Sequence, residues 1–111
     1  MISKETIDIV KKFRDDRNWS QFHNPKDLAI SINLEAAELL EIFQWSGDDL
    51  ECLKKLDMVK EELADVLSYC ILLADRYGLD LDEIIQAKMR KNAEKYPVEK
   101  AAGVATKYTD L

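Results

Sequence analysis

Four acidic residues stand in two pairs of equal spacing, and their type and spacing could bind a divalent cation. Glu35 and Glu38 stand at positions i and i+3, as do Glu62 and Asp65. On a helix such a pair lies about 60° apart, on one strip of the surface. Apolar residues flank both strips, so we expect both pairs to face the interior of a helical protein. Ionised carboxylates brought together there would repel one another unless a cation compensated them.

The donor atoms of these acids predict which cation would bind. Carboxylate oxygens are hard ligands, and no cysteine or histidine stands at a matching spacing, which favours Mg²⁺ or Mn²⁺ over Zn²⁺. A di-iron bundle would use Glu-x-x-His pairs, whereas the single histidine, His23, lies outside both helices. The alternative is that some of the acids are ordinary surface charges, as most acidic residues of helices are. Glu61 provides a comparison, because it lies on the side of its helix that we expect to be solvated.

The composition of the chain predicts that the elements positioning these acids are helices. Of 111 residues, only 3 are Gly and 2 are Pro, too few turn residues for a typical all-β fold. Chain-breaking residues separate four predicted helices, over residues 3–18, 25–45, 53–77 and 81–95. Ser3, Asn24 and Asp80 can cap the N-termini of three of them, and Gly78 can end the third.

These helices predict the organisation of the chain. We expect an all-α fold, with a bundle of about four helices forming a single domain over residues 1–97. The last residues, 98–111, lack helical periodicity. We expect them to form a tail that is mobile or docked on a partner subunit.

Charge and hydropathy argue against several classes of function. Acidic residues number 22 against 16 basic residues, a formal net charge of −6, so a nucleic-acid polymer is not an expected partner. No uncharged stretch approaches the roughly 20 residues that a membrane span needs. We also expect no signal peptide, because charges occur early, and no disulfide or zinc site, because the two cysteines lack the spacing for one. These features favour a cytoplasmic protein with reduced thiols.

The acids belong to a larger set of motifs that resembles the MazG-like all-α nucleoside triphosphate pyrophosphohydrolases. Glu35-Ala-Ala-Glu38 and Glu62-Leu-Ala-Asp65 look like the ExxE and ExxD signature of that family. Four segments are similar to its dCTP pyrophosphatase branch: WSQFHNP at 19–25, EIFQW at 41–45, ELADVLSY at 62–69 and KMRKNAEKYP at 88–97. Together the motifs cover about residues 5–97.

The resemblance implies an enzyme that converts a nucleoside triphosphate, first of all dCTP or a modified dCTP, and water to the monophosphate and diphosphate. It implies Mg²⁺ on Glu35, Glu38, Glu62 and Asp65 as the catalytic and metal-binding residues, with Mn²⁺ as the other candidate. It also implies an active unit of associated protomers, a homodimer or homotetramer, and the second predicted helix favours this because it is apolar nearly all round. Two alternatives stay open: dUTP or another non-standard nucleotide as substrate, and a non-catalytic helical binding or regulatory module.

The same resemblance implies a set of substrate-binding residues. Trp19 and Trp45 would form walls of a base pocket by stacking, whereas the structural alternative for both is to anchor a core. His23 would contact the substrate, although a histidine outside such a motif is more often a solvent-facing loop residue. The expected substrate-binding residues are Trp19, Ser20, Gln21, Phe22, His23, Trp45, Tyr69, Lys88, Lys91, Asn92, Lys95 and Tyr96.

The last predicted helix carries a strip of positive charge. Lys88, Lys91, Asn92 and Lys95 follow i, i+3, i+4, i+7 spacing and therefore share one face. Such a strip in an acidic protein could hold a triphosphate. The alternative is that these cations only complement the dipole at the end of the helix. Lys95 stands where the resembling branch carries an arginine.

Overall fold

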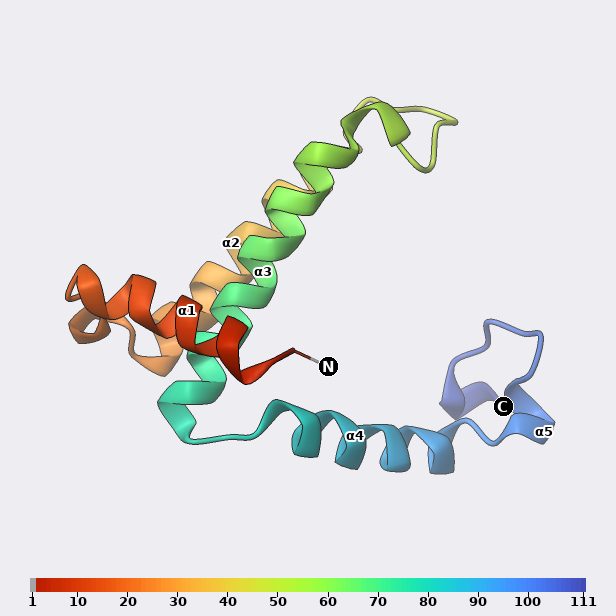
Figure 1. Ribbon diagram of the computed structural model, residues 1–111. Helices are drawn as coiled ribbons and strands as arrows, with labels where there is room; N and C mark the ends of the chain where they lie inside the picture. Colours follow the sequence, from red (N-terminus) through yellow and green to blue (C-terminus); the bar gives the residue numbers. More distant parts are fainter. Residues whose placement is uncertain (1) are drawn as a thin grey trace. The chain divides into compact units, whose positions relative to one another are not determined.

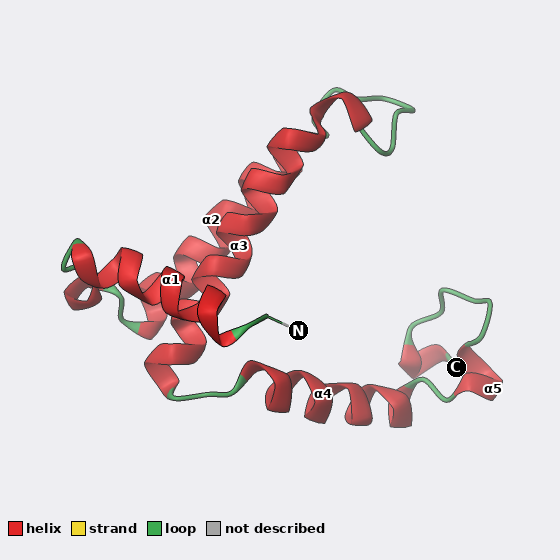
Figure 2. Ribbon diagram, in the orientation of Figure 1, coloured by secondary structure: helices red, strands yellow, loops and turns green. Residues whose placement is uncertain are grey.

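The regular structure is entirely helical in residues 2–111, the part of the chain that the computed structural model describes (Figure 2). The helices are α1 (Lys4–Asp16), α2 (Pro25–Glu41), α3 (Leu56–Tyr77), α4 (Leu81–Lys95) and the short α5 (Val98–Ala101). Three 3₁₀ turns accompany them: η1 (Ser20–Phe22), η2 (Leu53–Lys55) and η3 (Tyr108–Asp110). The predicted all-α fold is thus confirmed. Within the same residues, no helix combines the length and the apolar character needed to cross a lipid bilayer.

Local sequence explains where the long helices begin and end. The side chains of Ser3, Asn24 and Asp80 each accept a hydrogen bond, of 3.1, 2.9 and 3.1 Å, from the backbone N–H of the third residue after them. Each bond satisfies a donor that the first turn of a helix leaves free. Pro25 occupies the first turn of α2, where its missing N–H costs nothing. Gly78 ends α3 in the left-handed conformation, with φ 68°.

Three helix boundaries differ from their predicted positions. Helix α1 ends at Asp16 rather than residue 18, and α3 begins at Leu56 after η2 rather than at residue 53. The largest difference is at the end of the second helix. We expected the second helix to continue to about Trp45, but α2 ends at Glu41. The N–H groups of Phe43 and Gln44 donate to the carbonyls three residues back, so tight turns replace the helix after Glu41. Trp45 then takes a left-handed conformation, with φ 66°. No glycine or proline precedes Trp45 in this stretch, so the sequence contains no local signal for the early end.

The chain forms two compact units, Met1–Gly78 and Leu79–Leu111. In the first unit, α2 and α3 run alongside each other as an antiparallel pair, and α1 packs against α3 (Figure 1). The buried core is small, because few side chains are withdrawn from solvent in the chain by itself. It consists of Leu28, Ile42, Cys52, Ile71, Leu72 and Ala74.

Large apolar side chains stay exposed on both helices of the α2–α3 pair. On α2 they include Ile30, Leu34 and Leu40, and on α3 they include Leu56, Met58, Leu63 and Leu67. Exposed apolar surface of this extent is typical of a surface that another molecule covers.

The second unit contains α4 and the C-terminal residues. Tyr108 of η3 packs edge-on against Tyr96, with ring centroids 5.9 Å apart. The Lys95 ammonium nitrogen lies 4.8 Å from the centre of the Tyr108 ring, within cation–π range. Part of the predicted tail therefore contacts the end of α4, while the domain boundary at residue 97 stays a prediction.

Candidate functional site

Three carboxylates converge where α2 and α3 pack together. Glu35 comes from α2, and Glu62 and Asp65 come from α3, where their spacing places them on one strip. One carboxylate oxygen from each residue lies within 4.8 Å of the corresponding oxygens of the other two. The structure therefore brings together three of the four predicted metal ligands. Glu38 is exposed, as Asp65 is, and lies outside this group.

Two oxygens of this cluster are buried and unpaired. Glu35 Oε2 and Glu62 Oε2 have no hydrogen-bond partner, a costly state for a carboxylate. Burial, reinforced by the neighbouring Glu38 carboxyl, raises the pKa of Glu35 to about 7. The same two causes raise the pKa of Glu62. Glu38 is thus close enough to act on both groups although it faces solvent.

A divalent cation fits this arrangement. The donors are carboxylate oxygens, the ligands that Mg²⁺ and Mn²⁺ prefer. None of the ion pairs formed within residues 2–111 uses Glu35, Glu38, Glu62 or Asp65. A cation at the centre of the cluster would satisfy the two unpaired oxygens and favour the ionised carboxylates, whose pKa values are raised first by burial and then by the neighbouring carboxyl of Glu38.

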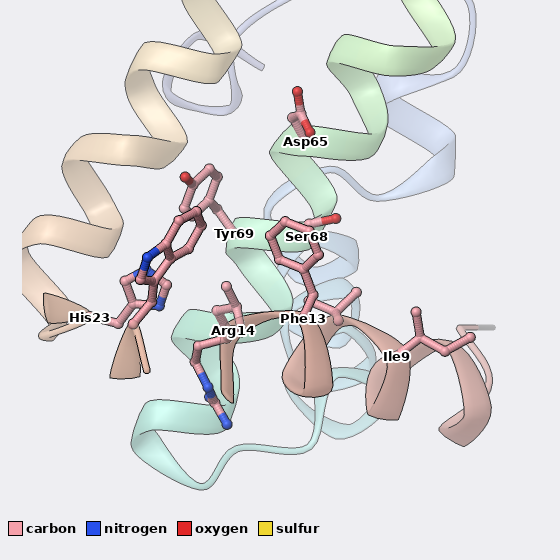
Figure 3. A pocket seen from close by; sticks show the side chains of 10 residues that line it. Ile9, Phe13, Arg14, His23, Asp65, Ser68 and Tyr69 are labelled. Carbon is pink, nitrogen blue, oxygen red and sulfur yellow. The ribbon is translucent and has the colours of Figure 1, made fainter. Parts of the chain in front are cut away.

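A pocket of about 280 Å³ lies beside the cluster, between α1 and α3 (Figure 3). From α1 and the segment after it the lining residues are Ile9, Val10, Phe13, Arg14, Trp19 and His23, and from α3 they are Asp65, Ser68, Tyr69 and Leu72. Asp65 belongs to both the pocket and the carboxylate cluster. A molecule in the pocket could therefore extend to the cluster.

Aromatic rings form a continuous wall of this pocket. The ring centroids of Phe13 and Trp19 are 5.8 Å apart, those of Trp19 and His23 6.5 Å, and those of His23 and Tyr69 6.4 Å. All three contacts are edge-to-face, a favourable arrangement for aromatic side chains. The Arg17 guanidinium carbon lies 3.6 Å from the centre of the Phe13 ring. The wall is thus held by contacts within the chain itself.

His23 contributes a polar atom to the pocket wall. Its Nδ1 atom is buried and has no hydrogen-bond partner. Burial lowers the pKa of the imidazole, and the positive charge of Arg14 lowers it further, so the ring is neutral at pH 7. A neutral imidazole has one donor and one acceptor nitrogen. It can therefore form a hydrogen bond with the polar edge of a ligand.

The other predicted substrate-binding residues lie elsewhere. Trp45 follows α2 outside the pocket and is 91% exposed in the chain by itself, whereas Trp19 is 42% exposed. Ser20, Gln21 and Phe22 form η1, which leads to His23 without lining the pocket. The second unit holds the rest of the set, on α4 and directly after it: Lys88, Lys91, Asn92, Lys95 and Tyr96.

Sequence reasoning missed the contribution of α1 to the pocket. Phe13 and Arg14 both line the cavity, but neither belongs to a motif that predicts chemistry. A usable signal did exist, because Lys11 and Arg14 stand at i and i+3 in the register of the apolar residues of this helix. Cations within an apolar register indicate a partner charge on the element that the helix packs against.

Known proteins resemble this chain in sequence and structure. The sequence pattern of the MazG-like family matches residues 30–111. The dCTP pyrophosphatase 1 of Mus musculus is 40% identical over 105 residues, which span 90% of this chain and 62% of the mouse protein. That of Bos taurus is 36% identical, over 98% of this chain and 70% of its own length. The crystal structure of a pyrophosphatase from Archaeoglobus fulgidus has a TM-score of 0.78 and 47% identity, and the match covers 85% of this chain and 91% of that one. The chain thus spans less than two thirds of the mouse relative.

Proposed function

The chain belongs to the MazG-like family, and we propose that it is a divalent-metal-dependent nucleoside triphosphate pyrophosphohydrolase. The reaction would consume one water and one nucleoside triphosphate and yield the monophosphate and diphosphate. The observation that carries this proposal is the shared position of Asp65, which lies in both the carboxylate cluster and the aromatic pocket. A candidate cation site thus adjoins a cavity with an aromatic wall, which supports binding of a phosphate chain beside a flat ring. The names of the relatives, dCTP pyrophosphatase 1 and pyrophosphatase, support the same reaction.

The carboxylate cluster would supply the reaction centre. Glu35, Glu62 and Asp65 would hold Mg²⁺ or Mn²⁺, with Glu38 as a fourth carboxylate beside them. A cation bound there would offset the negative charge of the triphosphate and favour ionisation of the attacking water. The carboxylates alone would repel a triphosphate, so the residues of this cluster act by retaining and orienting the cation.

The aromatic pocket would hold the nucleobase. Trp19 offers a ring face for stacking, which contributes roughly 1–3 kcal/mol per base. His23 would form a hydrogen bond with the base edge. Cytosine presents an amino donor and a ring-nitrogen acceptor, and uracil presents the reverse pair. A neutral imidazole can match either base. Because the relatives are named for dCTP, we rank dCTP or a modified dCTP first, and dUTP or another non-standard nucleotide is the second candidate.

Self-association is part of the proposal. The exposed apolar residues of α2 and α3 would be covered by a second copy of the chain in a homodimer or homotetramer. Trp45 lies outside the pocket of its own chain, so its proposed stacking role requires the pocket of a neighbouring protomer. The tail at 98–111 would dock on such a partner. Lys88, Lys91, Asn92 and Lys95 of α4, together with Tyr96 directly after it, would contact phosphates.

A panel of nucleoside triphosphates tests the proposal. Diphosphate release is measured for each triphosphate with Mg²⁺, with Mn²⁺ and with excess chelator. We expect dCTP or a base-modified dCTP to be hydrolysed fastest, and only with a divalent cation present. Faster hydrolysis of dUTP would change the substrate but retain the reaction. If no triphosphate is hydrolysed with either cation, the chain is instead a non-catalytic module.

A further inference from the structure

An ion cluster fastens α1 to α3 at one end of the pocket. The carboxylate of Asp75, on α3, lies between two cations of α1. Its Oδ2 accepts a hydrogen bond from Arg14 Nη1 at 2.8 Å, and its Oδ1 lies 3.2 Å from Lys11 Nζ. Both oxygens are therefore paired, and both pairs join the same two helices. The Arg14 side chain is only 11% exposed, so solvent screens its pair with Asp75 less than it screens a surface ion pair.

The attachment of α1 depends strongly on this cluster. No residue of α1 is buried, so apolar burial alone holds the helix weakly. The hydrogen bond from Arg14 and the charge of Lys11 lower the pKa of Asp75. The carboxylate is therefore ionised at neutral pH and available to both cations. A charge-assisted, partly buried hydrogen bond is stronger than a neutral one.

The position of the cluster links it to the recognition part of the site. Asp75 continues the strip of α3 that carries Asp65, Ser68 and Leu72, because these positions follow i, i+3, i+7, i+10 spacing. Those three residues line the pocket. On the other side, the Arg14 carbonyl accepts a hydrogen bond of 3.1 Å from the Trp19 N–H. Arg14 thus connects α3 to the backbone that places the Trp19 ring.

The cluster stands apart from the carboxylates that would hold the cation. In Figure 3, the Arg14 guanidinium is directed away from Asp65, and Phe13 and Tyr69 lie between these two residues. Asp75 does not line the pocket. Any effect of Asp75 on a bound nucleotide must therefore pass through Arg14 and the wall that α1 forms.

We propose that Asp75, acting through Arg14 and Lys11, is a positioning residue that fixes the α1 wall of the pocket and thereby sets the affinity for the nucleobase. The identity of the ligand rests on the proposed function, whereas the fastening of α1 does not. Loss of the cluster would let α1 move away from α3, and Trp19 would then meet the base less often in the stacking position. The carboxylate cluster on α2 and α3 would be unchanged.

The variant Asp75→Asn tests the proposal, with Asp15→Asn as its matched control. Asp15 also pairs with Arg14, at 2.8 Å, but it lies on the same segment as Arg14 and joins no second helix. We expect Asp75→Asn to raise the KM for dCTP, and its Kd with Ca²⁺, about 3- to 10-fold. The kcat and the affinity for the metal alone should stay at the wild-type value. Asp15→Asn should leave all four quantities close to wild type.

Hydrogen exchange of the α1 backbone amides measures the fastening without any ligand. We expect these amides to exchange faster in Asp75→Asn than in wild type or Asp15→Asn, while α2 and the first half of α3 keep their protection. Lys11→Met, which removes one of the two cations, should produce a smaller change in the same direction. If Asp75→Asn does not fold, the exchange of the α1 amides in Lys11→Met provides the test instead.

A double variant shows whether Asp75 acts through Arg14. Arg14→Met keeps an unbranched side chain at the pocket wall but removes the charge. If the pair is the route, Arg14→Met combined with Asp75→Asn should weaken dCTP binding no more than the more damaging single change. If the fold-changes in dCTP affinity of the two single variants multiply in the double variant, the proposal is overturned. It is also overturned if the α1 amides of Asp75→Asn exchange at the wild-type rate, or if Asp75→Asn lowers kcat and leaves KM constant. If the wild-type chain binds no nucleotide, the proposed function fails, and α1 exchange still decides the fastening.

Discussion

The carboxylate cluster and the aromatic pocket share Asp65 but are built in opposite ways. The cluster gathers like charges, leaves Glu35 Oε2 and Glu62 Oε2 without partners, and raises the pKa of both residues. The pocket wall is held by ring contacts within the chain and by the ion pairs of Asp75. The cluster leaves two buried oxygens for a cation to satisfy, whereas the α1 and α3 sides of the pocket are held in place by the chain's own contacts. The cluster therefore suits the chemical step, and the pocket suits recognition.

The largest effect on activity is expected when one carboxylate of the cluster is removed. Glu62→Gln keeps the size of the side chain but removes an anionic ligand. We expect kcat to fall about 100-fold or more, because even the residues that support metal ligands cost 10- to 100-fold when changed. Helical content by circular dichroism should be unchanged. Glu38→Gln should also lose most of the activity.

Glu61→Gln is the matched control for this change. Glu61 precedes Glu62 on α3 and is exposed, so its substitution should be nearly silent. Turnover of Glu62→Gln near the wild-type value at saturating Mg²⁺ would reject Glu62 as a ligand.

The next largest effect is expected when the pocket wall is changed and the carboxylate cluster is left intact. Trp19→Ala should weaken dCTP binding about 10- to 100-fold, because stacking contributes roughly 1–3 kcal/mol per base. Affinity is measured with Ca²⁺ in place of the catalytic cation, and Tm is measured without nucleotide. A tryptophan that served only the core would give the reverse pattern: a destabilisation of about 3–5 kcal/mol and unchanged affinity.

The sequence predicted the elements more completely than it predicted the pocket. Ser3, Asn24-Pro25, Gly78 and Asp80 mark helix ends through local chemistry, and the structure has helix ends at all of them. Repeated i, i+3 acids likewise predicted which residues of α2 and α3 would share a strip. Each of these signals lies within one helix or at its end, so it does not depend on how the helices pack together.

Long-range contacts explain what the sequence did not predict. Arg14 and Asp75 are 61 positions apart, so their pairing depends on how α1 packs on α3, which no local pattern specifies. The early end of α2 at Glu41 has a similar explanation. The residues after it could extend a helix, but the burial of Ile42 and Cys52 in the connection to α3 favours tight turns.

A smaller effect tests whether the pocket is completed by a second copy of the chain. In a homo-oligomer in which Trp45 reaches a neighbouring pocket, Trp45→Ala should weaken dCTP binding, although less than Trp19→Ala does, because Trp45 does not line the pocket of its own chain and is 91% exposed there. Sedimentation at low micromolar concentration should show dimers or tetramers. A stable monomer that hydrolyses dCTP at the full rate would contradict this assembly.

The smallest effect concerns the stability of the metal-free protein. Because the folded-state pKa of Glu35 is raised to about 7, the folded chain binds more protons than the unfolded chain between about pH 4.5 and 7. The Glu35 contribution to stability should therefore rise as pH falls from 8 to 5, with the full penalty present above pH 7, whereas His23, whose pKa is lowered by burial, contributes with the opposite sign below about pH 6.5. Saturating Mg²⁺ should flatten this dependence, and Glu35→Gln should remove most of it. Thermal unfolding across this range, with and without Mg²⁺, provides the measurement, and a Tm that falls as pH is lowered from 8 to 6 would contradict the assignment to Glu35.

The most direct test of a single site shared by the cluster and the pocket is calorimetric titration of dCTP into the protein with Ca²⁺ or with excess chelator. If Asp65 joins a cation site to a base pocket, the cation should strengthen dCTP binding, and dCTP should strengthen cation binding by the same factor. Glu62→Gln should abolish this mutual enhancement, and Trp19→Ala should weaken dCTP binding with or without the cation. Equal dCTP affinity with Ca²⁺ and with chelator would contradict the account, because the two regions would then act independently.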